Sequence, residues 1–302
     1  MSSLISVIPS ILMIVAPILI AAIGGMICER SGVVNIALEG LMGIGGCTAA
    51  AAHYFMEAAG FGGSSVWLAL LFGSLVGLLF SVIHAVAAID LRADQTISGT
   101  GLNLLADGVT IFASQILFNA DRTKEFKMGM LTDKLGIYPT AYIALVVVLI
   151  AWFVLYKLPF GMHLRACGEH PSAADSVGIN VRKIRYSAVL TSGFLAGLAG
   201  GCCILTQSIQ YTAGTINGRG FISLAAVSFG RWTPLGVTGA AFLFGASQAL
   251  TVVANNFSFL RQFPSEIFNI IPYFVTLVAL VIFSGKNYSP AANGKAYEKG
   301  AS

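Results

Sequence analysis

The stretch RACGEHPSAADSVGINVRKIR, residues 165–185, is a polar interruption between two apolar runs, and it carries its own helix signals. Pro171 suits the first turn of a helix, where its missing N–H is not needed. Gly178 suits the position just after a helix, where the chain turns left-handed. Residues 172–177 between them make about two turns. A helix this short is not stable alone in water, so we expect it to rest on its own protein or on a partner.

The composition of the whole chain is that of an integral membrane protein. Of the 302 residues, 56% are hydrophobic and only 10% are charged, whereas a soluble domain carries roughly 25% charged residues. The net charge of +4 is spread thinly and does not indicate a nucleic-acid partner. The five cysteines show no metal-binding spacing and are interpreted as buried thiols.

Long charge-free runs predict the spans, because a bilayer core of ~30 Å takes about 20 helical residues. Residues 205–230 are too polar and glycine-rich for a plain lipid-facing helix, which predicts either a loop plus a half-helix or a broken span. We therefore expect an all-α polytopic bundle of roughly 8 to 10 spans with broken or re-entrant segments. The apolar runs are 4–27, 40–56 with a start near Val33, 68–89, 96–118 with Asp107 at its middle, 135–156, 186–200, 236–254 and 267–283.

The chain divides into one membrane domain, 1–285, and a polar tail, 286–302, which we expect to be mobile. The segment 157–185 carries five Lys and Arg residues, against four in 119–139. Cytoplasmic loops carry the larger share of Lys and Arg, which favours 157–185 as a cytoplasmic loop.

Glycines at helical spacing predict close contacts between the spans. Gly73 and Gly77 form one such set, and Gly193, Gly197 and Gly200 form another. Small residues let helix backbones approach closely, which matters in lipid because no hydrophobic effect drives helices together.

Two polar pairs lie inside the predicted membrane region. Asn35 with Glu39, and Asn103 with Asp107, each place a carboxylate four residues after an asparagine, so each pair would share one helical face. Acidic groups at this depth are costly and normally face a cavity or a partner. Two interpretations stay open: the pairs line a polar pathway, or they brace helices through hydrogen bonds.

Motifs of enzymes are missing from the sequence. It contains no G-x4-G-K-[S/T] phosphate loop, no G-x-S-x-G and no H-E-x-x-H. We expect no catalytic activity and no cofactor or metal site in this chain.

The segment around the short helix resembles the EAA loop of ATP-binding-cassette (ABC) importer permeases. Glu169, the Ala173–Ala174 pair and Gly178 are similar to the glutamate, alanine pair and glycine of that loop, although the glutamate lies further upstream. Pro171 and Asp175 complete the candidate. In the family these residues form the coupling helix that docks on the ATPase.

Three further blocks resemble the nucleoside and simple-sugar permeases of the branched-chain amino acid and ribose permease superfamily. They are GGMICERSGVVNIALEGLMGIGG (24–46), LRADQTISGTGLNLLADGVT (91–110) and GFISLAAVSFGRWTPLGVTGAAFLFG (220–245). Within this group ERSGVVNIALEG is similar to the nucleoside branch.

The resemblance implies a type II-like importer permease in a bacterial cytoplasmic membrane, with a nucleoside as solute. It implies three partners: a second homologous permease, which would form a heterodimer with this chain, a cytoplasmic ATPase with two nucleotide-binding domains that uses ATP and Mg²⁺, and an extracytoplasmic substrate-binding lipoprotein. Asn35, Glu39, Asn103 and Asp107 would line the pathway. The alternatives are a sugar or riboflavin-like solute, an ion-coupled secondary transporter, and a non-transporting scaffold.

Overall fold

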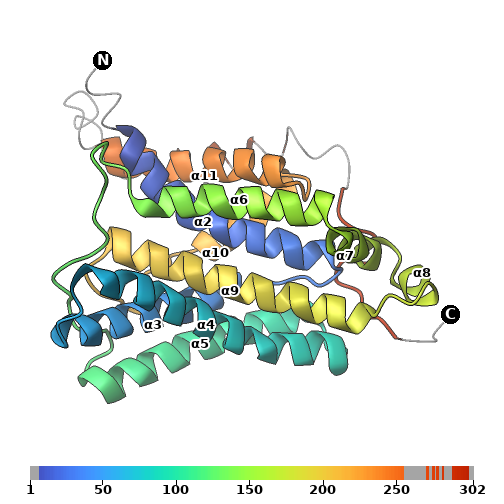
Figure 1. Cartoon of the computed structure of the whole chain (residues 1–302), viewed down its shortest axis with the longest axis horizontal. Coiled ribbons are helices and arrows are strands. Elements are labelled where there is room, and N and C mark those ends of the chain that lie inside the picture. Colours follow the sequence, from blue (N-terminus) through green and yellow to red (C-terminus); the bar gives the residue numbers. More distant parts are fainter. Residues whose placement is uncertain are drawn as a thin grey trace.

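The computed structural model describes residues 7–254 and 288–298, together with residues 270, 271, 274, 275, 277, 278 and 281. Over these residues the chain is an all-α bundle of roughly parallel and antiparallel helices, and Figure 1 shows their arrangement. The elements are α2 (Val7–Arg30), α3 (Leu38–Ala58), the 3₁₀ turn η1 (Gly62–Ser64), α4 (Ser65–Ala85), the π-helical turn η2 (Val86–Asp90), α5 (Gln95–Phe118), α6 (Pro139–Lys157), α7 (Pro159–Glu169), α8 (Pro171–Ser176), α9 (Val181–Gln207), α10 (Arg219–Phe229) and α11 (Pro234–Ala254).

Five segments of the described chain are long and apolar enough to cross a membrane: Val7–Arg30, Gly62–Asp90, Gln95–Phe118, Pro139–Lys157 and Val181–Gln207. Helix α5 agrees with the predicted run 96–118 almost to the residue. The predicted run 267–283 lies largely outside the described residues. The total of 8 to 10 spans therefore stays a prediction.

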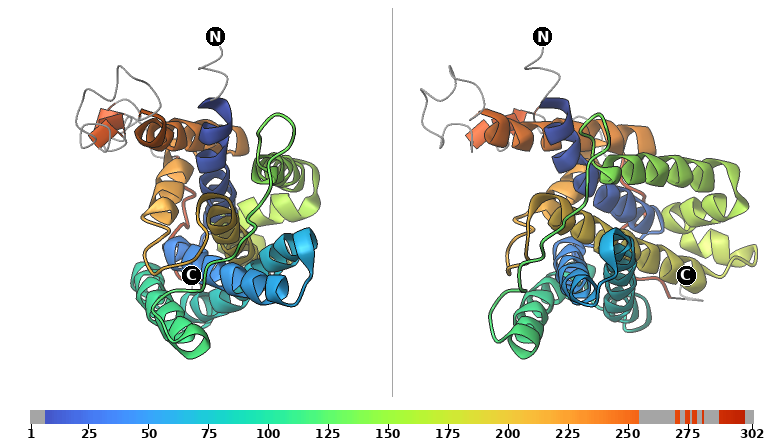
Figure 2. Two further views of the ribbon diagram at one scale, coloured as in Figure 1. Left: turned by 90° about the vertical axis from the view of Figure 1, so that its left-hand side faces the viewer. Right: turned by 60° about the vertical axis from the view of Figure 1, so that its left-hand side comes forward.

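Helix α9 lies near the middle of the bundle, with α3 and α4 on one side and α2 on the other (Figure 2). The predicted glycines make these contacts. A Cβ on Gly77 would lie 2.6 Å from the carbonyl oxygen of Gly193, and a Cβ on Gly73 would lie 2.6 Å from that of Gly45. No real side chain tolerates such distances, so the backbones of α3, α4 and α9 touch directly where these glycines lie, as the spacing predicted.

The start of α3 differs from the prediction. The helix begins at Leu38 rather than near Val33, and residues 31–37 form turns and irregular chain. Gly32 has a φ of +90°, and the β-branched pair Val33–Val34 that follows it disfavours a helix. Because Asn35 precedes the helix, Asn35 and Glu39 do not share a helical face, and that prediction is wrong.

The polar segment 157–185 is more regular than a loop. It contains α7 as well as the predicted short helix α8. Pro159 occupies the first turn of α7, where a proline is well tolerated. Glu169 is therefore the last residue of α7, and His170 separates it from α8.

Residues 205–230 form a loop plus a half-helix, the first of the two predicted alternatives. Helix α9 ends at Gln207, residues 208–218 are a loop, and α10 follows with 11 residues. The backbone N–H of Thr123 donates to the carbonyl of Tyr211 at 2.9 Å, and that of Phe126 donates to Ile209 at 2.9 Å. The α5–α6 connection thus covers the loop at the end of the bundle opposite α8 (Figure 1).

Candidate functional site

The short helix α8 lies at one end of the bundle, near residues 288–298 (Figure 1). Pro171 occupies its first turn, and Gly178 follows it with a φ of +87°. Ala173 is exposed, and Val177 is 75% exposed, although it is apolar. Ala174 instead packs inward against Cys167 and Val181, so only one alanine of the pair offers surface. The outer side of α8 is therefore a small, partly apolar surface that a partner can contact.

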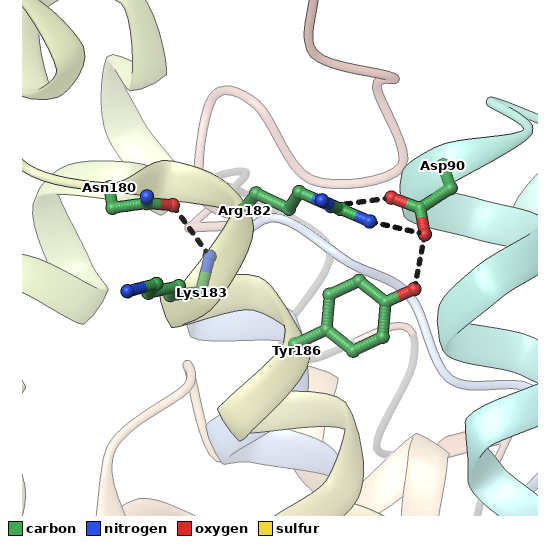
Figure 3. A network of polar contacts seen from close by, with 5 residues as sticks. All are labelled: Asp90, Asn180, Arg182, Lys183 and Tyr186. Atoms are coloured by element: carbon green, nitrogen blue, oxygen red, sulfur yellow. Dashed lines mark hydrogen bonds and ion pairs between the residues drawn. The ribbon is translucent and has the colours of Figure 1, made fainter.

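The start of α9, directly after α8, is fixed by a polar network (Figure 3). The guanidinium of Arg182 donates to both carboxylate oxygens of Asp90, at 2.7 and 2.9 Å. The hydroxyl of Tyr186 donates to the same carboxylate at 2.5 Å. Asn180 caps α9 by accepting the backbone N–H of Lys183 at 2.9 Å. The contacts with Asp90 join the start of α9 to the π-helical turn after α4.

The polar groups at the centre of the bundle surround the start of α10. Glu39, in the first turn of α3, accepts the backbone N–H of Gly218 and that of Gly220, both at 2.7 Å. The first N–H groups of a helix have no partner inside it and carry the positive end of its dipole. A carboxylate from a different helix satisfies them here, which explains how a short helix can begin inside the bundle.

Asn103 and Asn35 use their side chains to hold neighbouring segments. Asn103 accepts the backbone N–H of Gly40 at 2.8 Å and donates to the carbonyl of Ile36 at 3.0 Å. Asn35 donates to the hydroxyl of Ser192 at 2.9 Å. Both side chains are buried, so these hydrogen bonds support the bracing interpretation, and a pathway role for the two asparagines stays a prediction.

Asp107 differs from the other three residues because it is exposed on the surface of this single chain. It follows Asn103 by one helical turn on α5, between the exposed apolar side chains of Leu104 and Phe112. A carboxylate on such a helix is not stable against lipid, so it faces a water-filled space or another subunit. The α5 side of the bundle, with α3 between α5 and α10, is thus the side on which a polar path is expected (Figure 2).

Glu29 and Trp232 form a junction that the sequence analysis missed. The indole N–H of Trp232 donates to the buried carboxylate of Glu29 at 2.5 Å, and Arg30 donates to the carbonyl of Trp232 at 2.8 Å. The junction joins the end of α2 to the turn between α10 and α11. The available signal was an acidic residue at the end of an otherwise charge-free apolar run.

Residues 288–298 also reach the α8 end, although the tail was expected to be mobile. Ala292 is 6% exposed, and its backbone N–H donates to the carbonyl of Gly168 at 2.8 Å. Arg92 forms an ion pair with Glu298 at 2.7 Å. This part of the tail therefore has defined contacts with the bundle, which the sequence analysis did not foresee.

The long apolar helices, the carboxylate-capped half-helix and the short surface helix together define a polytopic α-helical permease. Comparison with known families agrees with this class. The family described as the permease component of branched-chain amino acid transport systems matches residues 7–280. The chain belongs to this family and is a transport subunit rather than an enzyme.

Its relatives include transporters of several solutes. The guanosine ABC transporter permease protein NupQ of Bacillus subtilis is 40% identical, with 97% of each chain covered. The nucleoside ABC transporter permease protein NupC of Lactococcus lactis is 38% identical, covering 97% of this chain and 96% of the relative. The putative glucose ABC transporter permease protein TsgC13 of Haloferax volcanii is 34% identical over 80% of this chain and 75% of the relative.

Proposed function

We propose that this chain is the membrane permease of an ABC importer for nucleosides. The observation that carries this proposal is the nearly full-length similarity to two permeases whose names specify guanosine and nucleosides. The similarity to a putative glucose permease covers less of the chain at lower identity, which makes a sugar the second candidate. The expected location is the bacterial cytoplasmic membrane.

The partners follow from this assignment. An ATPase with two nucleotide-binding domains supplies the energy, using ATP and Mg²⁺, and this chain needs no cofactor of its own. A substrate-binding lipoprotein delivers the solute from outside, and a second homologous permease completes the membrane part as a heterodimer. The exposed carboxylate of Asp107 is consistent with a second subunit, because this residue needs another subunit or a water-filled space beside it rather than lipid.

The α8 surface is the proposed ATPase contact. A ligand drives a conformational cycle only when it binds one state better than another. ATP closes the ATPase, the ATPase moves α8, and the glycine-packed bundle carries this movement to the polar groups around α10. Glu169, Pro171, Ala173, Ala174, Asp175 and Gly178 are the proposed coupling residues, with Ala174 acting from inside as the packing contact of the helix.

The experiment is uptake of labelled guanosine into proteoliposomes that contain the complete transporter, with ATP inside and the binding protein outside. We expect uptake that needs ATP, persists without an ion gradient and is competed by other nucleosides but not by glucose. Competition by glucose would favour the sugar alternative, and uptake that follows an ion gradient without ATP would favour a secondary transporter.

The coupling residues are tested in the same assay with Glu169→Ala and Gly178→Pro. Both variants should uncouple ATP hydrolysis from uptake while the complex still assembles. Normal uptake by both variants at matched expression would contradict the proposed contact.

A further inference from the structure

Residues 288–298 cross the α8 end of the bundle and are called the C-terminal strap below. Within the described chain the strap contacts segments that are far apart in sequence. It begins with Tyr288, whose ring packs under the guanidinium of Arg231 at 4.5 Å, and it ends with the ion pair between Glu298 and Arg92. Between these ends it passes over α7, α8, α9 and the connection from α2 to α3.

One set of strap contacts holds α7 and α8. The backbone N–H of Ala291 donates to the carboxylate of Glu169 at 3.2 Å, and the neighbouring N–H of Ala292 donates to the carbonyl of Gly168. Tyr297 packs on the cluster that buries Ala174. Its hydroxyl hydrogen-bonds to Asp175, and burial, followed by the charge of that carboxylate, raises the pKa of Tyr297. The strap thus contacts Glu169 and Asp175, the two proposed coupling residues that carry a carboxylate.

A second set of strap contacts holds the end of α2 and the connection between α2 and α3. The side-chain N–H of Asn293 donates to the carboxylate of Glu29 at 3.3 Å, and the backbone N–H of Gly294 donates to the carbonyl of Gly32 at 3.2 Å. Arg185 of α9, which is 2% exposed, donates to the carbonyl of Lys295 at 3.0 Å and fixes the middle of the strap. The two sets of contacts are therefore made by one short segment, residues 291–297.

The α2–α3 connection leads directly to the polar groups at the centre of the bundle. The backbone of Val34 donates to Gln95 at 2.7 Å, and its carbonyl lies 2.9 Å from a ring nitrogen of His84. The carbonyl of Ile36 accepts from Asn103, and Glu39 holds the start of α10. A shift of residues 31–37 would therefore change contacts at α4 and α5, and the Asn35 contact with Ser192 adds α9. Glu39, which holds α10, follows this connection by two residues.

We infer that the C-terminal strap is a positioning element, which passes a displacement of α8 to the α2–α3 connection and from there to the polar groups around α10. The part of this inference that concerns coupling rests on the proposed function. The mechanical link itself does not, because it is a property of this chain alone. The strap works alongside the direct packing of Gly168 on the backbone of Arg30, where a Cβ would overlap the Arg30 carbonyl.

The link is tested by hydrogen–deuterium exchange on the full chain in phospholipid nanodiscs. Asn293→Ala removes the side-chain contact with Glu29, and Tyr297→Phe removes the hydroxyl contact with Asp175. Each variant should speed exchange both in residues 31–37 and in residues 168–180, by about tenfold for the loss of a hydrogen bond to a charged group. Faster exchange in 288–298 alone would overturn the inference.

Lys295→Ala is the matched control, because Lys295 contacts Arg185 through its backbone carbonyl and its side chain is exposed. We expect wild-type exchange in this variant. A double variant, Asn293→Ala with Tyr297→Phe, distinguishes a link between the two sides from two independent local contacts. If the strap links α8 to the α2–α3 connection, the two substitutions together speed exchange in residues 31–37 by less than the sum of their separate free-energy effects. Fully additive effects would contradict the link.

The coupling role is tested separately, as the number of ATP molecules hydrolysed per guanosine imported in proteoliposomes. Asn293→Ala should raise this ratio several-fold and leave assembly with the ATPase unchanged, while Lys295→Ala leaves the ratio at the wild-type value. An unchanged ratio in Asn293→Ala would refute the coupling role. A wild-type complex that imports no nucleoside would instead refute the proposed function, and the exchange experiment would still decide whether the link exists.

Discussion

The crossing of α3, α4 and α9 and the α8 end are held together by different kinds of contact. At the crossing the backbones touch through glycines such as Gly77 and Gly193, with no space for a side chain. At the α8 end, segments up to 264 residues apart in sequence meet through hydrogen bonds and ion pairs, many of them exposed. Close packing resists deformation, whereas partly exposed polar contacts are weak and can be exchanged. The comparison indicates that the crossing of α3, α4 and α9 is rigid and that the contacts at the α8 end can rearrange.

The largest expected effect is at the crossing. A Cβ on Gly197 would overlap the Gly73 carbonyl and lie 3.1 Å from the Cα of Gly77, so Gly197→Leu forces α4 and α9 apart. Overpacking of this kind costs about 3 kcal/mol or more, and we expect little folded protein by fluorescence-detected size exclusion. Gly101→Leu is the control, because no atom lies within 4 Å of a Cβ there. Equal yields of the two variants would show that the crossing is not rigid.

The next effect is at the start of α10. Glu39→Ala leaves the N–H groups of Gly218 and Gly220 without their acceptor, which costs about 1–3 kcal/mol for each unsatisfied group. Glu39→Gln keeps one side-chain acceptor oxygen and should therefore lose less stability than Glu39→Ala. Thermal unfolding of the purified protein checks the order wild type, Gln, Ala. The same stability for the Ala and Gln variants would mean that water replaces the carboxylate.

A smaller effect is expected from replacing a glycine at either end of the bundle. Gly178 and Gly60 have φ values of +87° and +84°, and a Cβ on either would meet no atom within 4 Å. Replacement by alanine costs each variant about 1–2 kcal/mol of backbone strain. Only Gly178→Ala lies beside α8, so guanosine uptake should fall in this variant alone, at matched expression. A similar fall of uptake in Gly60→Ala would show that lost stability, and not the position beside α8, causes both effects.

The smallest effect is at the ion pair that fixes α9. The side chain of Arg182 is 68% exposed and that of Asp90 is 28% exposed, so solvent and salt screen their attraction. Arg182→Ala should lower the unfolding temperature slightly at low salt and not at high salt, and Tyr186 still donates to Asp90 in this variant. A large decrease of the unfolding temperature at high salt would show that the network stabilises more of the fold than the start of α9.

The sequence predicted those elements whose signals are local. Helix α5, the helix between Pro171 and Gly178, and the half-helix α10 all follow from apolar periodicity and from proline or glycine at the helix ends. Helix α7 was missed because the whole segment 157–185 was read as one polar loop, although Pro159 marked its start. The pairing of Asn35 with Glu39 failed because a single early glycine and two β-branched residues end the helical pattern.

The contacts of the candidate site were not predictable in the same way. Glu39 finds its partners 179 and 181 residues later, and Glu29 accepts from Trp232, which follows it by 203 residues. No local pattern encodes which carboxylate caps which helix, because this depends on how the spans pack. The strap contacts are of the same kind: those of Ala291, Ala292 and Gly294 use backbone N–H groups, which almost every residue carries.

The carboxylate at the start of α10 has a consequence for the choice of solute. The N-terminus of a helix is a ready binding site for phosphate, but here the amides of Gly218 and Gly220 already hold Glu39. A phosphorylated nucleotide would find no free anion site at this point, because Glu39 already occupies the two amides. If the proposed nucleoside path passes the start of α10, we expect it to discriminate against phosphate esters, whereas an uncharged nucleoside does not need an anion site.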